Sequence, residues 1–141
     1  MVTGIVPYLV TNGNGQEAVK FYQHSLGAEL LSLSTFGDMP EDPNHPTTPE
    51  MKNLVMNAQM KIGDALLMLS DNMPGQPYQL GSHVTVALMV SSTEKAKEIF
   101  EKLQEGGEVT MPLQETFWSP AYGQLTDKFG VAWQVSTDPE K

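Results

Sequence analysis

The sequence predicts an α+β fold made of two similar βαβββ modules, and three observations support this class. First, 141 residues with 40% hydrophobic content are enough to enclose one core. Second, the order strand, helix and three strands can be traced in each half of the chain. Third, short motifs recur at matching places: Ala18-x-x-Phe21-Tyr22 resembles Ala96-x-x-Ile99-Phe100, and Gly63-x-Ala65 resembles Gly130-x-Ala132. We therefore expect one domain over residues 1–141, with modules at approximately 1–75 and 80–141.

The first module begins with a short strand at residues 8–10, followed by a turn-prone run of Asn and Gly. Asn14 is the expected N-cap of a helix, with Glu17 returning a bond as in a capping box, and Gly27 ends the helix. Three extended segments then indicate strands, at 29–36, 54–62 and 65–70. Gly63-Asp64 forms the tight turn between the last two strands.

The second module repeats this order, starting with a Val- and Thr-rich strand at residues 83–90. Ser91 and Glu94 form the expected capping box of its helix, which ends before Gly106-Gly107. Three further strands are expected at 108–113, 122–126 and 132–136. Phe129-Gly130 lies in the last hairpin turn, after Asp127, whose side chain is expected to bond to the turn backbone. Phe129 and Trp133 are expected in the core.

Residues 37–50 interrupt the symmetry of the two halves. Proline recurs there every third residue, from Pro40 to Pro49, without an apolar pattern. Proline cannot donate regular ladder bonds, so the segment is predicted to be an extended surface loop. We interpret it as a long surface loop or a lid, with a PxxP ligand segment as the alternative.

Composition excludes several classes of function. The formal charge is −9 and all eight basic residues are lysines, so a nucleic-acid partner is not expected. The chain has no cysteine, which excludes thiolate chemistry and Cys-ligated metals. There is no 18-residue apolar run, no signal-peptide pattern at the N-terminus and no Rossmann-type glycine-rich turn. We expect a cytoplasmic protein that does not contact membranes.

Several motifs together resemble the PhnB-like branch of the glyoxalase/bleomycin-resistance/dioxygenase (vicinal oxygen chelate) superfamily. They run through nearly the whole chain: Phe21-Tyr22-x-x-x-Leu26-Gly27, Phe36-Gly37-Asp38-Met39-Pro40, Met68-Leu69-Ser70-Asp71-x-Met73-Pro74, Gln114-Glu115-Thr116-Phe117-Trp118 and Asp127-Lys128-Phe129-Gly130-Val131-x-Trp133. The resemblance implies a curved eight-stranded mixed sheet with a concave ligand cavity, usually completed in a homodimer. In catalytic members a divalent metal in that cavity binds two adjacent substrate oxygens.

Position by position, the resemblance places the first-strand metal ligand near Pro7 or Tyr8 and the fourth-strand ligand near Leu67 or Met68. It places the fifth-strand ligand near Thr85. The eighth-strand position falls on Gln134, while His83 lies two residues from Thr85 on the same strand face. Gln134 and His83 are thus weak candidate ligands and do not make the usual set of carboxylates and imidazoles. We expect no metal cofactor, with a bound divalent ion as the alternative.

The expected ligand-binding residues are listed here together: Tyr8, Met68, His83, Trp118, Tyr122 and Gln134. Trp118 and Tyr122 offer large apolar area with a polar handle, although they could instead pack against a partner chain. Glu115, beside the aromatic pair Phe117-Trp118, is the candidate catalytic base, with an ordinary surface role as the alternative. His24 and His45 are expected to face solvent.

The sequence thus favours a homodimeric small-molecule-binding protein of unassigned activity, without a complete metal site. One version is a resistance-type role, in which an aromatic drug is sequestered between two protomers. The alternative is a metal-dependent lyase, isomerase or dioxygenase that uses Gln134, His83 and Glu115. A purely structural role is a third class, and a cavity filled by the protein's own side chains would indicate it.

Overall fold

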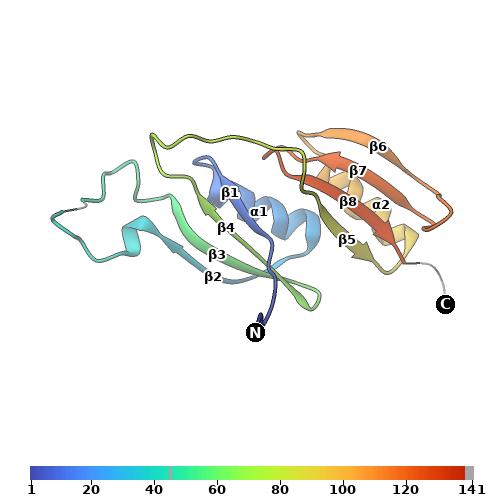
Figure 1. Cartoon of the computed structure of the whole chain (residues 1–141), viewed down its shortest axis with the longest axis horizontal. Coiled ribbons are helices and arrows are strands. Elements are labelled where there is room, and N and C mark those ends of the chain that lie inside the picture. Colours follow the sequence, from blue (N-terminus) through green and yellow to red (C-terminus); the bar gives the residue numbers. More distant parts are fainter. Residues whose placement is uncertain (45, 139–141) are drawn as a thin grey trace. The chain divides into compact units, whose positions relative to one another are not determined.

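The computed structural model describes residues 1–44 and 46–138 and divides the chain into two compact units. Unit 1 is Met1–Tyr78 and unit 2 is Gln79–Lys141. Each unit contains one α-helix and one four-stranded mixed sheet (Figure 1). The predicted α+β class with two βαβββ modules is therefore confirmed, and the eight strands lie in two four-stranded sheets.

Unit 1 follows the predicted order of elements. These are β1 (Tyr8–Thr11), α1 (Gly15–Leu26), β2 (Glu29–Thr35), the 3-10 turn η1 (Phe36–Asp38), β3 (Val55–Ile62) and β4 (Ala65–Asp71). The strands are arranged β1-β4-β3-β2, with β1 parallel to β4 and the other pairs antiparallel. The left-handed conformation of Gly63, with φ of 56°, makes the tight turn between β3 and β4.

Unit 2 repeats this topology. Its elements are β5 (Val86–Val90), α2 (Thr93–Leu103), β6 (Glu108–Gln114), β7 (Tyr122–Thr126) and β8 (Ala132–Thr137). The order is β5-β8-β7-β6, and again the first strand is parallel to the last. The two parallel pairs sit at equivalent places in the two sheets, as an internal duplication predicts.

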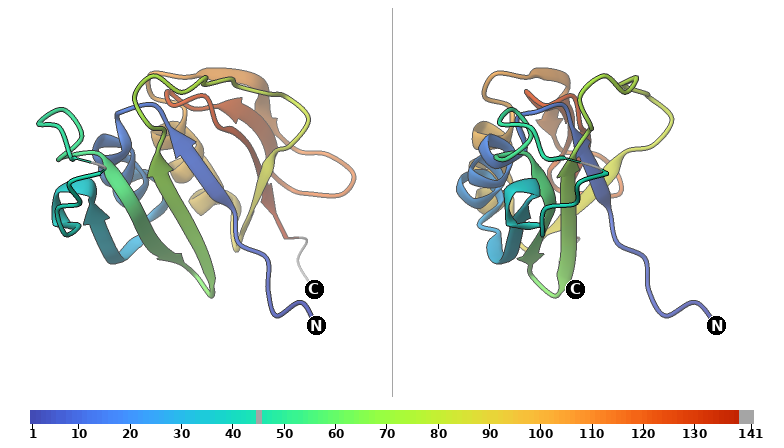
Figure 2. Two further views of the ribbon diagram at one scale, coloured as in Figure 1. Left: turned by 60° about the vertical axis from the view of Figure 1, so that its left-hand side comes forward. Right: turned by 90° about the vertical axis from the view of Figure 1, so that its left-hand side faces the viewer.

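In each unit the helix covers one face of its own sheet (Figure 2). Along β4 the buried residues Leu67 and Leu69 alternate with the half-buried Leu66 and Met68, because neighbouring residues of a strand point to opposite faces. The same alternation along β8 buries Trp133 and Val135. Phe129 is also buried, so the core positions predicted for Phe129 and Trp133 are confirmed.

The start of α1 differs from the prediction. Asn14 is the N-cap, but its side chain makes no capping bond, so the predicted capping box is wrong. The buried carboxylate of Asp71, at the end of β4, accepts the backbone N–H of Gly15 at 2.8 Å and that of Gly13 at 3.0 Å. A carboxylate from another strand thus satisfies the free N–H groups at the helix start.

Asp71 also joins neighbouring strands. Its Oδ1 accepts the hydroxyl of Thr11 at 2.7 Å, and its Oδ2 accepts the backbone N–H of Val55 at 2.8 Å. An added Cβ at Gly15 would lie 2.7 Å from Asp71 Oδ2, so only glycine fits there without displacement. One buried side chain therefore connects β1, the start of α1, β3 and β4.

The start of α2 is capped locally, one residue later than predicted. The N-cap is Ser92 and not Ser91, and its hydroxyl accepts the backbone N–H of Lys95 at 3.2 Å. On the exposed side of this helix, Lys102 and Lys95 contact the carboxylate of Glu98. The hydrogen bond from Lys102 and the charge of Lys95 hold the pKa of Glu98 below its ordinary value of 4.5.

The hairpin between β7 and β8 is organised by a second buried carboxylate. Asp127 Oδ1 accepts the backbone N–H groups of Phe129 and Val131 at 2.8 and 3.1 Å. Asp127 Oδ2 accepts the indole N–H of Trp133 at 2.8 Å. The predicted turn-forming role of Asp127 is confirmed, and the bond to Trp133 adds an anchor to the core.

After η1, residues 39–44 and 46–50 form a largely exposed loop without a helix or strand, as the proline spacing predicts. Neither α1 nor α2, the helices of the described part of the chain, has the length and apolar character that a membrane span requires.

Candidate functional site

Unit 2 places several of the predicted residues on the face of its sheet that α2 does not cover, here called the helix-free face. Gly123 faces α2, because a Cβ at this position would lie 2.7 Å from the ring of Phe100. Its neighbours Tyr122 and Gln124 therefore point to the opposite face. Gln134 lies opposite Gln124 in the antiparallel register, so it shares this face.

Four side chains on the helix-free face are joined by hydrogen bonds, and we call them the amide–phenol chain. Gln124 Nε2 donates to the hydroxyl of Tyr122 at 3.0 Å, and the Tyr122 hydroxyl donates to Gln134 Oε1. Gln134 Nε2 in turn donates to Thr85 Oγ1 at 2.7 Å. The structure thus brings the predicted Tyr122 and Gln134 into direct contact.

Two aromatic rings extend this group. The Trp118 and Tyr122 rings meet edge to face with centroids 5.2 Å apart, and Phe117 meets Trp118 in the same way at 4.8 Å. Tyr122 is buried, whereas Trp118 is 49% exposed and Phe117 is 98% exposed. The half-exposed indole thus provides a flat apolar surface in contact with Tyr122, one member of the chain.

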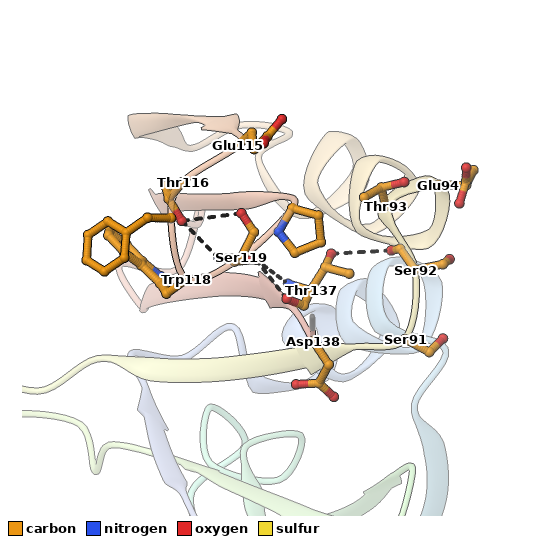
Figure 3. A pocket seen from close by; sticks show the side chains of 12 residues that line it. Ser91, Ser92, Thr93, Glu94, Glu115, Thr116, Trp118, Ser119, Thr137 and Asp138 are labelled. Carbon is orange, nitrogen blue, oxygen red and sulfur yellow. Dashed lines mark hydrogen bonds between the residues drawn. The ribbon is translucent and has the colours of Figure 1, made fainter. Parts of the chain in front are cut away.

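Glu115 and Trp118 both line a cavity of about 410 Å³ in unit 2. The residues around it lie at the start of α2, in the loop between β6 and β7, and at the end of β8 (Figure 3). The buried Ser119 hydroxyl lies 2.7 Å from the carbonyl oxygen of Thr137 and 3.1 Å from its N–H, which ties this loop to the end of β8. Glu115 itself is exposed, so its carboxylate remains accessible to solvent.

Tyr8 and Met68 lie in unit 1, where they are direct partners in the parallel pair of β1 and β4. They share the face of this sheet that α1 does not cover, since the adjacent Leu9 and Leu69 are buried. The Tyr8 hydroxyl accepts Asn57 Nδ2 at 3.3 Å. Unit 1 thus also carries a tyrosine hydroxyl bonded to a carboxamide side chain.

His83 does not lie in a strand. β5 begins at Val86, so His83 falls in an exposed bend before it and the predicted strand at 83–90 is too long at its start. The imidazole lies close to Gly81, a residue of the same bend. His24 is exposed on α1, as predicted, and His45 lies outside the described residues.

The donor groups on the strands do not fit a divalent metal. Within residues 1–44 and 46–138, no three His, Asp or Glu side chains lie close enough together to hold an ion. At the eighth-strand position, the amide oxygen of Gln134 already accepts the Tyr122 hydroxyl. Divalent cations are held by several carboxylates, imidazoles or thiolates, and one neutral amide does not replace them.

Sequence reasoning missed Gln124 and the bonding role of Thr85. Strand alternation could have found Gln124, because it lies two residues after Tyr122 and therefore on the same face. Thr85 precedes β5 and is 49 residues from Gln134, so its bond depends on how the two segments meet in the fold.

Comparison with known proteins gives consistent matches over nearly the whole chain. A family model described as the Glyoxalase/Bleomycin resistance protein/Dioxygenase superfamily matches residues 4–135. Protein YjdN of Escherichia coli (strain K12) is 36% identical over an alignment of 136 residues, and the match covers 92% of this chain and 92% of that protein.

Solved structures agree with these matches. Protein PA1353 from Pseudomonas aeruginosa superposes with a TM-score of 0.85 at 40% identity, covering 99% of this chain and 100% of that one. A structure from Bacillus cereus, named putative 3-demethylubiquinone-9 3-methyltransferase, PhnB protein, has a TM-score of 0.77 at 25% identity. It covers 96% of this chain and 99% of its own.

Proposed function

The chain belongs to the glyoxalase/bleomycin resistance protein/dioxygenase superfamily, and we propose that within it this protein binds a small molecule without a complete divalent-metal site. The observation that carries this proposal is the bonding state of Gln134. Its amide oxygen accepts the Tyr122 hydroxyl and its amide nitrogen donates to Thr85. Because both polar atoms of this amide bond to other side chains, the arrangement supports a site that recognises ligands by hydrogen bonds between uncharged groups.

The helix-free face of unit 2 supplies what such a site needs. Small-molecule sites combine apolar walls with a few placed polar groups. Here the half-exposed Trp118 is the apolar wall, and Tyr122, Gln134 and Thr85 are the polar groups. In this proposal Tyr8 and Met68 of unit 1 and His83 of unit 2 are further ligand-binding residues.

Metal analysis tests the proposal directly. We expect protein purified without chelator or affinity metal to contain far less than one divalent ion per chain. We also expect Ni, Co, Mn, Fe and Zn salts to leave the melting temperature unchanged. An ion at 100 times its Kd would stabilise the folded state by about 2.7 kcal/mol, which a melt detects easily.

The opposite result would identify the alternative function. Near-stoichiometric metal, or a melt raised by one ion at low concentration, would indicate a metal-dependent lyase, isomerase or dioxygenase. In that case, replacement of Gln134 and His83 should abolish the metal effect, and Glu115→Gln should abolish turnover with the metal still bound. A control variant, Glu101→Gln on the exposed side of α2, should change neither.

We further propose that the protein is a cytoplasmic homodimer, with a resistance-type sequestering role as one version of its function. Exposed apolar residues beside and within the edge strand β5 support association: Val84 is 68% exposed and Met89 is 62% exposed. Sedimentation equilibrium should give twice the 15.5 kDa mass of one chain. A mass of 15.5 kDa at micromolar concentration would exclude the homodimer.

A further inference from the structure

The amide–phenol chain can form the same number of hydrogen bonds in two directions. In the first, Gln124 donates to Tyr122, Tyr122 to Gln134, and Gln134 to Thr85. If both glutamine amides turn over, Thr85 donates to Gln134, Gln134 to Tyr122, and Tyr122 to Gln124. Amide oxygen and nitrogen are close in size and a hydroxyl both donates and accepts, so each direction makes three bonds.

The direction of the chain decides what Thr85 offers to a ligand. In the first direction Thr85 accepts the bond from Gln134, and its own O–H hydrogen is not used within the chain. In the second direction the O–H is used within the chain, and the oxygen lone pairs face outward. Thr85 is exposed. A ligand carbonyl therefore needs the first direction, in which the Thr85 O–H is available, whereas a ligand hydroxyl can donate to a lone pair of Thr85 in either direction.

The strands that carry the chain are nearly free of charge. The four strands of unit 2 contain one charged residue, Glu108, which faces Thr126 across the β6–β7 pair. No strand of this sheet supplies a cation, and the whole protein carries a formal charge of −9. A ligand anion would lose its hydration on this sheet and gain no positive partner from its strands.

We infer that the amide–phenol chain and Trp118 select an uncharged, planar aromatic ligand that carries either a hydroxyl or a carbonyl group. The aromatic part lies on the half-exposed indole, and the oxygen group bonds to Thr85. This inference rests on the proposed function, because it specifies the ligand of the same site.

Three naphthalene probes test the inference by calorimetric titration at pH 7. They are 2-naphthol with a hydroxyl, 2-acetonaphthone with a carbonyl, and 2-naphthoate, which has nearly the shape of the ketone but a negative charge. We expect the two neutral probes to bind with affinities within about threefold of each other. The anion should bind at least about tenfold more weakly, a difference of about 1.4 kcal/mol.

Two variants test the role of the chain. Thr85→Val removes the hydroxyl at constant size and should weaken both neutral probes by about threefold to tenfold, the usual effect of one hydrogen bond. Thr126→Val, on the same face but outside the chain, is the matched control and should leave both affinities unchanged. Equal effects of the two variants would overturn contact between the ligand and Thr85.

Gln134→Glu tests the reversibility of the chain, because a carboxylate only accepts hydrogen bonds. Thr85 must then donate to residue 134 and can offer only its lone pairs to a ligand. We expect 2-acetonaphthone to lose affinity relative to 2-naphthol by about tenfold. An unchanged ratio in a variant that melts as a folded protein would contradict the two-direction model.

The outcomes separate this inference from the proposed function. Binding of 2-naphthoate as tight as that of the ketone, or no binding of any probe at millimolar concentration, overturns the ligand class. Neither result concerns the metal content of the protein. The proposed absence of a complete metal site is therefore tested separately, by the metal analysis described above.

Discussion

Replacing Asp71 by Asn should weaken unit 1 by a predictable amount. The side chain keeps its size, but the atom facing the buried N–H of Val55 becomes an amide nitrogen that cannot accept a bond. An unsatisfied buried N–H costs about 1–3 kcal/mol. The bonds from Thr11, Gly13 and Gly15 also lose their charged acceptor, so we expect a total loss of about 3 kcal/mol in the free energy of unfolding at pH 7.

Urea unfolding followed by far-ultraviolet circular dichroism measures this loss. Circular dichroism is the suitable signal because both tryptophans, Trp118 and Trp133, lie in unit 2. Asp64→Asn, in the exposed turn between β3 and β4, is the matched control and should change stability by less than about 0.5 kcal/mol. Amide exchange at Val55 should also become faster in Asp71→Asn. A loss within about 1 kcal/mol of the control, with unchanged exchange at Val55, would refute the reasoning.

Two further changes test the same structure at other points. Gly15→Ala should lower the free energy of unfolding by about 1–3 kcal/mol, because the new methyl group collides with the buried carboxylate of Asp71. A neutral or stabilising effect in urea unfolding would show that the structure relaxes around the methyl group without cost. Glu98→Gln should lower stability at pH 7, and the difference from the parent should shrink as the pH falls below 4.5, because a lowered carboxyl pKa stabilises the fold only while the group is ionised. Urea midpoints measured across this pH range test this prediction, with Glu101→Gln on the same helix as the control. If the two variants showed the same pH dependence, the ion pairs of Glu98 would not contribute to stability.

Local sequence patterns predicted the secondary structure well. Alternation and turn residues located all eight strands in the described part of the chain, and most of their ends agree with the structure within one residue. The clear exception is β5, whose predicted start at His83 is three residues early. Val and Thr favour extended backbone before a strand as well as within it, so composition alone does not show where ladder bonding begins.

Helix capping shows where local reasoning ends. For α2 a serine next to the helix start caps it, one residue from the predicted position. For α1 the acceptor is Asp71, which is 56 residues from Gly15, and the nearby Asn14 does not cap. A short-range motif can be read from the sequence, whereas an acceptor from another strand is set by the packing of β4 against the helix start.

The candidate site divides in the same way. The sequence by itself determined the α+β class and the duplicated modules, because these follow from periodicity and turn chemistry. Its resemblance to the family also made Gln134 a candidate, and the aromatic residues Trp118 and Tyr122 were candidates for their large apolar area with a polar handle. Only the tertiary structure decided that Tyr122 bonds to Gln134 and that Thr85 ends the chain. Those contacts depend on strand register, which is fixed by the packing of whole strands and not by the residues that meet.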